Sequence, residues 1–155
     1  PEPALQKCGI AQILEGTISL VSVKARSQGI TIRKDIDAVL PETVADKEQM
    51  RQVFLNVILN AMESMPDGGA LEAGAKSIEN KKGVSAIEIK IKDSGCGIPF
   101  EMIKKVSEPF FTTKTEGTGL GLFITSRILE RHKGSIAISS EQGRGTTVSI
   151  ELPIV

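Results

Sequence analysis

Three glycines at alternate positions, Gly117, Gly119 and Gly121, run directly into a segment whose apolar residues are spaced as in a helix. Glycine has no Cβ, so its backbone N–H group can turn onto a ligand. The N-terminus of a helix adds unpaired donors and the positive end of the helix dipole. This combination is typical of a phosphate cradle. A glycine run alone is also typical of a mobile loop, so the interpretation depends on the residues that accompany it.

Amides interrupt an otherwise apolar helix that is predicted from Asp46, its N-cap, to about Met65. The polar positions recur at spacings of three and four and therefore share one face. They are Gln49, Gln52, Asn56, Asn60 and Glu63. Asparagine is a poor helix former, so two of them here favour a ligand site over a merely solvated face. Carboxamide oxygens suit a Mg²⁺ ion that bridges phosphates.

Asp93 ends a predicted buried strand and is followed by Gly95 and Gly97. A carboxylate and two glycines after a strand also form a common turn. The functional interpretation is a carboxylate that accepts a hydrogen bond from the exocyclic amine of a flat heterocycle, with the glycines leaving room for the ring. Such a bond contributes about 1.5–3 kcal/mol, enough to select adenine over bases without that donor. Thr146 begins the last predicted strand, after what is otherwise a hairpin turn, and its hydroxyl is expected beside Asp93.

The segment 108–114 precedes the glycine run and contains Phe110, Phe111 and Lys114. It shows no helical or strand periodicity. One interpretation is a small apolar cluster beneath a loop. The other is a lid whose base is held by the aromatic rings, whose end is hinged by glycines, and whose lysine offers a charge to a phosphate.

The single histidine, His132, is expected at the C-terminus of a helix, where the dipole favours a partly positive imidazole. We interpret it as structural, because nothing pairs with it as a nucleophile and base. One histidine also cannot make a zinc site.

Length and charge restrict the class of protein. The 155 residues predict one domain, and equal numbers of basic and acidic residues, 19 each, argue against a nucleic-acid partner or contact with an acidic membrane. Cys8 and Cys96 fit free thiols in a reducing cytoplasm. No apolar run reaches the ~20 residues of a membrane span. Because the chain starts at Pro1, we interpret it as a cytoplasmic piece of a longer protein, whose parent is either membrane-anchored or soluble.

Hydrophobic periodicity predicts helices and strands without strict alternation. The expected helices cover residues 10–28, 46–65, 99–106 and 118–132, and the expected strands 29–34, 43–45, 71–77, 85–92, 135–140 and 146–152. Gly29 is expected to end the first helix. The mixture favours an α/β sandwich, with a mixed, mostly antiparallel sheet and helices on one face.

Four motifs follow one another in order: Asn56-x-x-x-Asn60-Ala61, Asp93-x-Gly95-x-Gly97, Glu108-Pro109-Phe110-Phe111 and Gly117-Thr118-Gly119-Leu120-Gly121-Leu122. With Gly143-x-Gly145-Thr146 they resemble the catalytic, ATP-binding domain of sensor histidine kinases, in the superfamily shared with gyrase and mismatch-repair ATPases. Segments 60–69 and 108–114 look most similar to nitrogen-regulation-type kinases.

The resemblance implies a Bergerat-type fold that binds ATP between the amide-bearing helix, the first glycine turn and a mobile lid. Asp93 would bind the adenine amino group with support from Thr146, and Asn60 would ligate Mg²⁺ with Asn56 nearby. Lys114 would add charge. The remaining nucleotide-binding positions would be Gly95, Gly97, Ile98, Phe110, Phe111, Gly117, Thr118, Gly119, Leu120 and Gly121. The chain departs from many relatives at Glu63, where they place a basic residue.

The resemblance further implies that a histidine on a dimerisation domain upstream accepts the γ-phosphoryl group, which then passes to a response regulator. The alternatives are a gyrase-type ATPase, a serine kinase of the anti-sigma type and a binding module without activity. Gyrase-type relatives carry a glutamate as general base where this chain has Asn56, which cannot take a proton, so slow hydrolysis is expected.

Overall fold

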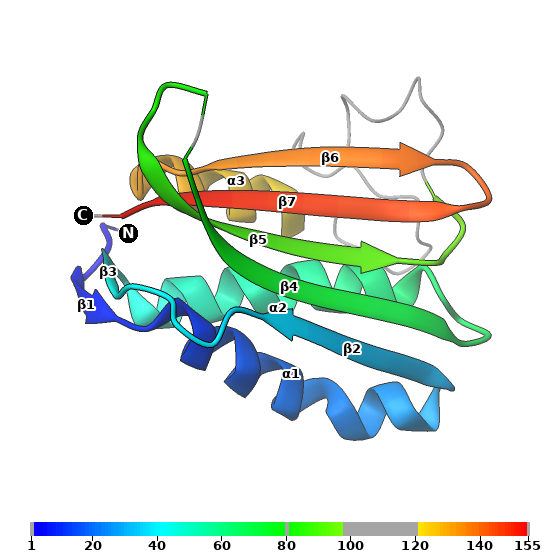
Figure 1. Ribbon diagram of the computed structural model, residues 1–155. Coiled ribbons are helices and arrows are strands. Elements are labelled where there is room, and N and C mark those ends of the chain that lie inside the picture. The colour runs from blue at the N-terminus through cyan, green and yellow to red at the C-terminus, as the bar shows by residue number, and fades with distance from the viewer. Residues whose placement is uncertain (1, 80, 98–120, 155) are drawn as a thin grey trace.

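A five-stranded sheet forms one layer of the protein in the computed structural model, which describes residues 2–79, 81–97 and 121–154. Its strand order is β2 (Ile30–Ile36), β4 (Gly69–Glu79), β5 (Ser85–Asp93), β7 (Gly145–Pro153) and β6 (Ser135–Glu141). Only β2 and β4 are parallel, and the other neighbours are antiparallel (Figure 1). β1 (Gln6–Cys8) and β3 (Thr43–Ala45) pair separately.

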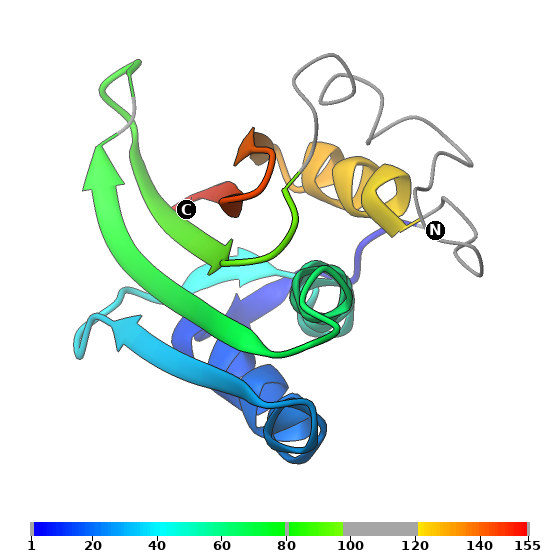
Figure 2. The same ribbon diagram turned by 90° about the vertical axis from the view of Figure 1, so that its right-hand side faces the viewer.

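In the described part of the chain, three helices form the second layer and lie on one side of the sheet (Figure 2). They are α1 (Ile10–Ser27), α2 (Lys47–Glu63) and α3 (Gly121–Arg131). α2 packs against α1, α3 and strand β5, so it is the central helix. The alternating isoleucines of β5, Ile87, Ile89 and Ile91, are buried on the helix side together with Phe54 of α2. This layer therefore holds the hydrophobic core.

The other face of the sheet carries charged side chains, because residues that alternate with the buried isoleucines point away from the helices. Lys90 is the example on β5, and it forms an ion pair with Glu88. Among the described residues, no helix is both long and apolar enough to cross a bilayer.

The predicted fold class and most predicted elements are confirmed. Asp46 caps α2 by accepting a hydrogen bond from the Gln49 N–H at 3.1 Å, and Gly29 follows α1 with a φ of 75°. The short strand β1 was not predicted. The expected helix over residues 99–106 and the first residues of the helix expected over 118–132 lie outside the described part of the chain.

Candidate functional site

Asp93 lies at the end of β5 and points to the helix side of the sheet, in phase with Ile87, Ile89 and Ile91. Its exposure is only 5%. The Oδ1 atom accepts hydrogen bonds from the backbone N–H groups of Gly95 at 2.9 Å and Thr146 at 3.3 Å. Burial raises the pKa of the Asp93 carboxyl, and these donors oppose that rise without cancelling it. The site therefore contains a buried acceptor whose ionised form is costly.

The glycine turn after Asp93 is held between two other segments. The N–H of Cys96 donates to the carbonyl of Ser64 at 3.2 Å, and its carbonyl accepts from the N–H of Gly143 at 2.7 Å. One side of the turn is thus fixed to the end of α2 and the other to the β6–β7 turn. This double attachment orients the Asp93 backbone relative to both elements.

The glycines of this turn are required by backbone packing. A Cβ on Gly95 would collide with Ser64, and one on Gly97, whose φ is 71°, would collide with the backbone of Glu141. A Cβ on Gly145, whose φ is 118°, would collide in the same way with the carbonyl of Asp93. Protein atoms therefore exclude a side chain at both positions. The expectation that Gly95 and Gly97 leave room for a bound ring stays a prediction.

The structure brings Thr146 next to Asp93, as predicted, but the hydrogen bond comes from its backbone N–H. The Thr146 hydroxyl lies 2.8 Å from the hydroxyl of Ser140 on β6. Sequence reasoning missed Ser140. The signal was available in the register of the last hairpin, where Ser140 faces Thr146 directly.

Ser64 is a second residue that sequence reasoning missed. It is the C-cap residue of α2, its hydroxyl donates to the carbonyl of Ala61 at 2.7 Å, and a Cβ on Gly95 would collide with that hydroxyl. Ser64 follows Asn56 and Asn60 at the same spacing of four and so continues the polar stripe that the sequence shows.

Asn56 and Asn60 are partly buried on α2, beside core residues such as Val57 and Ile58. A helix rises 1.5 Å per residue, so Asn60 and Asn56 lie roughly 6 and 12 Å along the axis from Ser64. Ser64 contacts the turn that follows Asp93. Asn60 and then Asn56 therefore lie at increasing distances from this turn along α2. Among the described residues no cluster of three or more His, Cys, Asp or Glu side chains could hold a metal ion, so an ion here would rely on amide, water and ligand oxygens.

Several predicted site residues lie outside the described part of the chain. They are Ile98, Phe110, Phe111, Lys114, Gly117, Thr118, Gly119 and Leu120. The expected lid belongs to the same segment. Gly121 is the first residue of α3, so a helix does follow the glycine run.

His132 is structural, but the expectation of a partly positive ring is wrong. Its Nε2 atom accepts the backbone N–H of Asp46 at 3.0 Å, and its Nδ1 atom lies 2.8 Å from the carbonyl of Ile128. Accepting at Nε2 requires a lone pair, so the ring is neutral and Nδ1–H donates to Ile128. The imidazole thereby connects the end of α3 to the start of α2.

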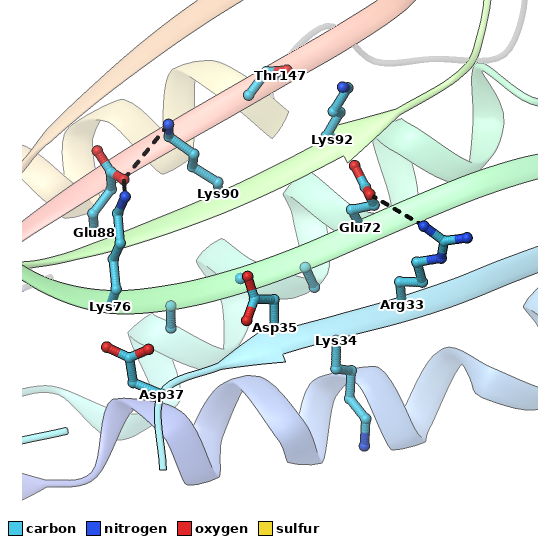
Figure 3. A pocket seen from close by; sticks show the side chains of 13 residues that line it. Arg33, Lys34, Asp35, Asp37, Glu72, Lys76, Glu88, Lys90, Lys92 and Thr147 are labelled. Carbon is cyan, nitrogen blue, oxygen red and sulfur yellow. Dashed lines mark ion pairs between the residues drawn. The ribbon is translucent and has the colours of Figure 1, made fainter. Parts of the chain in front are cut away.

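A hollow lies on the open face of the sheet, lined by residues such as Glu88, Lys90 and Lys92 (Figure 3). Asp93 alternates with these residues along β5, so its side chain points to the other side of the sheet. Its lining mixes basic and acidic side chains, and several of them form ion pairs. Glu88 lies 3.7 Å from both Lys76 and Lys90, and Arg33 lies 4.0 Å from Glu72. This hollow therefore offers no concentrated charge for a triphosphate.

Residues 45–155 match the family described as histidine kinase-, DNA gyrase B-, and HSP90-like ATPases. Over 145 residues the chain is 37% identical to sporulation kinase E of Bacillus subtilis, covering 94% of this chain and 19% of that protein. It is 35% identical over 151 residues to the sensor histidine kinase ZraS of Escherichia coli, covering 97% of this chain and 31% of ZraS. The chain thus spans about a fifth to a third of these relatives.

Solved structures show the same fold. Full-length ShkA, determined in complex with AMPPNP, superposes with a TM-score of 0.87 at 28% identity, over 100% of this chain and 32% of ShkA. The nucleotide-free catalytic domain of the histidine kinase ThkA gives a TM-score of 0.84 at 27% identity, over 97% of this chain and 95% of that one.

Proposed function

Because the chain belongs to the family of histidine kinase-, DNA gyrase B-, and HSP90-like ATPases, we propose that it binds Mg²⁺-ATP and presents the γ-phosphoryl group to a histidine. That histidine would lie on a dimerisation domain elsewhere in the protein, and a response regulator would receive the phosphate next. The resemblance to sensor histidine kinases along nearly the whole chain supports this choice.

The observation that carries the proposal is the buried carboxylate of Asp93. Both backbone donors hold Oδ1, so the orientation of the group is fixed. The second oxygen is then suited to accept a hydrogen bond from the exocyclic amine of adenine. A hydrogen bond from a purine amine would offset part of the free energy that burial of the carboxylate costs. The complex of ShkA with AMPPNP, an ATP analogue, supports the same type of ligand.

Asn60 and Asn56 are proposed to hold the metal and phosphate end of the ligand, since they continue along α2 from the Asp93 region. Mg²⁺, when bound, would neutralise part of the triphosphate charge. Their amide oxygens are hard ligands and their N–H groups can donate to phosphate oxygens. Lys114 and the backbone N–H groups of the glycine run are proposed to complete the phosphate site.

Phosphoryl transfer needs alignment and charge neutralisation more than covalent help from the protein. Asn56 cannot act as a base toward water, so the isolated domain should hydrolyse ATP slowly. This disfavours a gyrase-type ATPase as the main activity. The finer resemblance to nitrogen-regulation-type kinases is not confirmed, because the relatives compared above are a sporulation kinase and ZraS.

The test combines binding and transfer. A fluorescent ATP analogue is titrated with and without Mg²⁺ into the wild type, Asp93→Asn and the control Asp35→Asn, whose carboxylate is exposed on the open face of the sheet. Radiolabelled ATP is then supplied with a separately made dimerisation domain. We expect a labelled histidine, dependent on Asp93 and not on Asp35. Equal nucleotide affinity in all three proteins would refute the adenine role, and a labelled serine on a partner would favour the anti-sigma type.

A further inference from the structure

Ser140 of β6 holds the start of β7 through its hydroxyl. The Oγ atom donates to the carbonyl of Gly145 at 3.1 Å, and the same atom lies 2.8 Å from Oγ1 of Thr146. The two strands are paired so that Ser140 and Thr146 face each other, and residues that face each other on paired strands point to the same side of the sheet. The side chain of Ser140 therefore fixes both the backbone and the threonine hydroxyl at the point where β7 begins.

The two contacts of Ser140 decide which hydroxyl of the pair donates. A hydroxyl has one proton and two lone pairs, whereas a carbonyl oxygen can only accept. When the Ser140 proton lies on the Gly145 carbonyl, the proton between the two hydroxyls comes from Thr146, and both contacts are hydrogen bonds. In the opposite arrangement Ser140 donates to Thr146, and the contact with the carbonyl has no proton. The first arrangement is therefore favoured, and it leaves Thr146 Oγ1 only lone pairs for any further partner.

Thr146 lies beside the buried carboxylate of Asp93. Its backbone N–H donates to Asp93 Oδ1 at 3.3 Å, and Oδ1 also accepts the N–H of Gly95. The register that pairs Lys92 with Thr147 places Asp93 opposite Thr146, so both side chains point to the helix side of the sheet. The site thus presents two neighbouring acceptors, the second carboxylate oxygen of Asp93 and the hydroxyl oxygen of Thr146.

We propose that Ser140 is a positioning residue that determines base specificity: it accepts the hydrogen bond of the Thr146 hydroxyl, so that the site selects a purine with an exocyclic amine over one with a carbonyl at that position. The inference rests on the proposed function, because it assumes that Asp93 and Thr146 meet the base. An amine can donate to these acceptors, whereas a carbonyl would leave them unpaired. A water that donates both its protons to the two acceptors would likewise be left to accept from the base.

A matched serine on the opposite face of the same two strands provides the control. Ser139 faces Thr147 in the register of β6 and β7, as Ser140 faces Thr146. Successive residues of a strand point to opposite faces, so Ser139 and Thr147 lie on the open face, where Ser139 is exposed and Thr147 lines the hollow. Any effect that comes only from the loss of a β6 serine opposite a β7 threonine should therefore appear in Ser139→Ala as well.

The experiment measures how strongly the 155-residue chain prefers ATP to inosine triphosphate, whose base carries a carbonyl in place of the amine. Each nucleotide, with Mg²⁺, displaces a fluorescent ATP analogue from the wild type, Ser140→Ala, Ser140→Thr and Ser139→Ala. We expect the ratio of the two affinities to fall about 3–10-fold in Ser140→Ala, the range of one hydrogen bond. ATP should bind more weakly and inosine triphosphate equally well or more tightly, because the freed Thr146 hydroxyl can donate to a carbonyl. Ser140→Thr keeps a hydroxyl and should keep the ratio, and Ser139→Ala should not change it.

A double-variant cycle tests whether Ser140 acts through the Thr146 hydroxyl. Thr146→Val removes that hydroxyl with little change of shape, and the ratio should fall as in Ser140→Ala. Adding Ser140→Ala to Thr146→Val should then leave the ratio where it is, because residues in one hydrogen-bond network are not additive. A further fall in the double variant overturns the inference. An unchanged ratio in Thr146→Val overturns it as well, and this test remains if Ser140→Ala does not fold.

The outcomes separate this inference from the proposed function. Equal losses for both nucleotides in Ser140→Ala would show a purely structural serine and overturn the inference, and so would two unchanged affinities. If Asp93→Asn binds ATP like the wild type, the proposed function itself fails. A preference for ATP that depends on Asp93 but survives Ser140→Ala leaves the proposed function standing and removes only the role of Ser140.

Discussion

Two aspartates near opposite ends of α2 accept hydrogen bonds from backbone N–H groups, yet their carboxyls respond in opposite ways. Asp46 is the N-cap of α2, and Asp93 ends β5, beside the C-terminal end of that helix. At the N-terminal end, Asp46 accepts from the N–H groups of Gln49 at 3.1 Å and Ala4 at 2.8 Å. These bonds lower the pKa of Asp46, with the bond from Ala4 contributing most. At the C-terminal end, Asp93 also accepts two backbone donors, but burial dominates and raises its pKa.

The difference shows that donors alone do not decide the state of a carboxylate. Asp46 is only partly buried and keeps contact with water, so its hydrogen bonds are a net gain. Asp93 is 5% exposed, and the loss of hydration outweighs a similar set of bonds. One aspartate stabilises the start of a helix. The other costs folding energy when ionised, which is typical of a group kept for a ligand.

The largest effect is expected on ATP affinity, from substitution of Asp93. Asp93→Asn replaces a charged acceptor with a neutral amide of the same shape and should weaken ATP binding by about one to two orders of magnitude. Asp46→Asn should leave the affinity unchanged, since it alters the other end of the same helix. Titration of a fluorescent ATP analogue measures both. Equal losses in the two variants would show that the ends of α2 do not differ in function.

The next effect concerns the structural end, where His132 accepts the N–H of Asp46. His132→Ala leaves that N–H and the Ile128 carbonyl without their side-chain partner and removes a buried ring. We expect the free energy of unfolding to fall by about 1–3 kcal/mol, measured by urea denaturation. Nucleotide affinity of the folded protein should stay close to that of the wild type, since the His132 ring bonds to Asp46 and Ile128 and not to Asp93. A large loss of nucleotide affinity with unchanged stability would place His132 in the nucleotide site. It would contradict the view that the Asp46 end of α2 has a structural role only.

The contrast between the two ends was only partly visible in the sequence. The cap at Asp46 could be predicted because its signal is local: an N-cap residue followed by an apolar period. The alternating isoleucines of β5 likewise fixed which face of the strand is buried, and so on which side Asp93 points. Patterns of this kind depend on neighbours a few residues apart.

The contacts that define the candidate site join residues far apart in the chain. Thr146 reaches Asp93 across 53 positions, and His132 reaches Asp46 across 86. The position of Thr146 was predicted from its motif, but neither the donation from its N–H nor the bond of His132 has a local signal. The reason for glycine at 95 and 97 was equally hidden, because the atoms that exclude a side chain belong to α2 and to the β6–β7 turn.

A smaller effect is expected on the free energy of unfolding, from substitution of the helix cap Asp46. Asp46→Ala removes the side chain that accepts from Gln49 and Ala4 and should lower the unfolding free energy by about 1 kcal/mol, the usual value of an N-cap. Asp46→Asn should retain most of it, because asparagine caps helices as well as aspartate. Thermal unfolding near neutral pH compares the two. An alanine variant as stable as the wild type would mean that the bond of His132 to the Asp46 backbone suffices to hold the helix start.

The smallest expected effect is a difference in sign between the two aspartates as pH changes. For Asp46, whose folded pKa is lowered, the stabilisation is present above the unfolded pKa of about 3.9 and is lost as pH falls through the folded value. For Asp93, whose folded pKa is raised, the contribution is fully present below about 3.9 and is lost as pH rises through the folded value.

Each contribution is isolated by subtracting the stability of the asparagine variant from that of the wild type at every pH. The wild type minus Asp46→Asn should fall on acidification below about pH 4. The wild type minus Asp93→Asn should fall in the other direction, as pH rises above about 4, and then level off. Urea denaturation from pH 3 to 8 gives both differences. Saturating ATP should reverse the second trend only, because a ligand that prefers the ionised carboxylate stabilises the folded state most where Asp93 has lost its proton. Two differences with the same sign would mean that hydrogen bonding, not burial, governs both carboxyls, and the argument that Asp93 is held for a ligand would lose its physical basis.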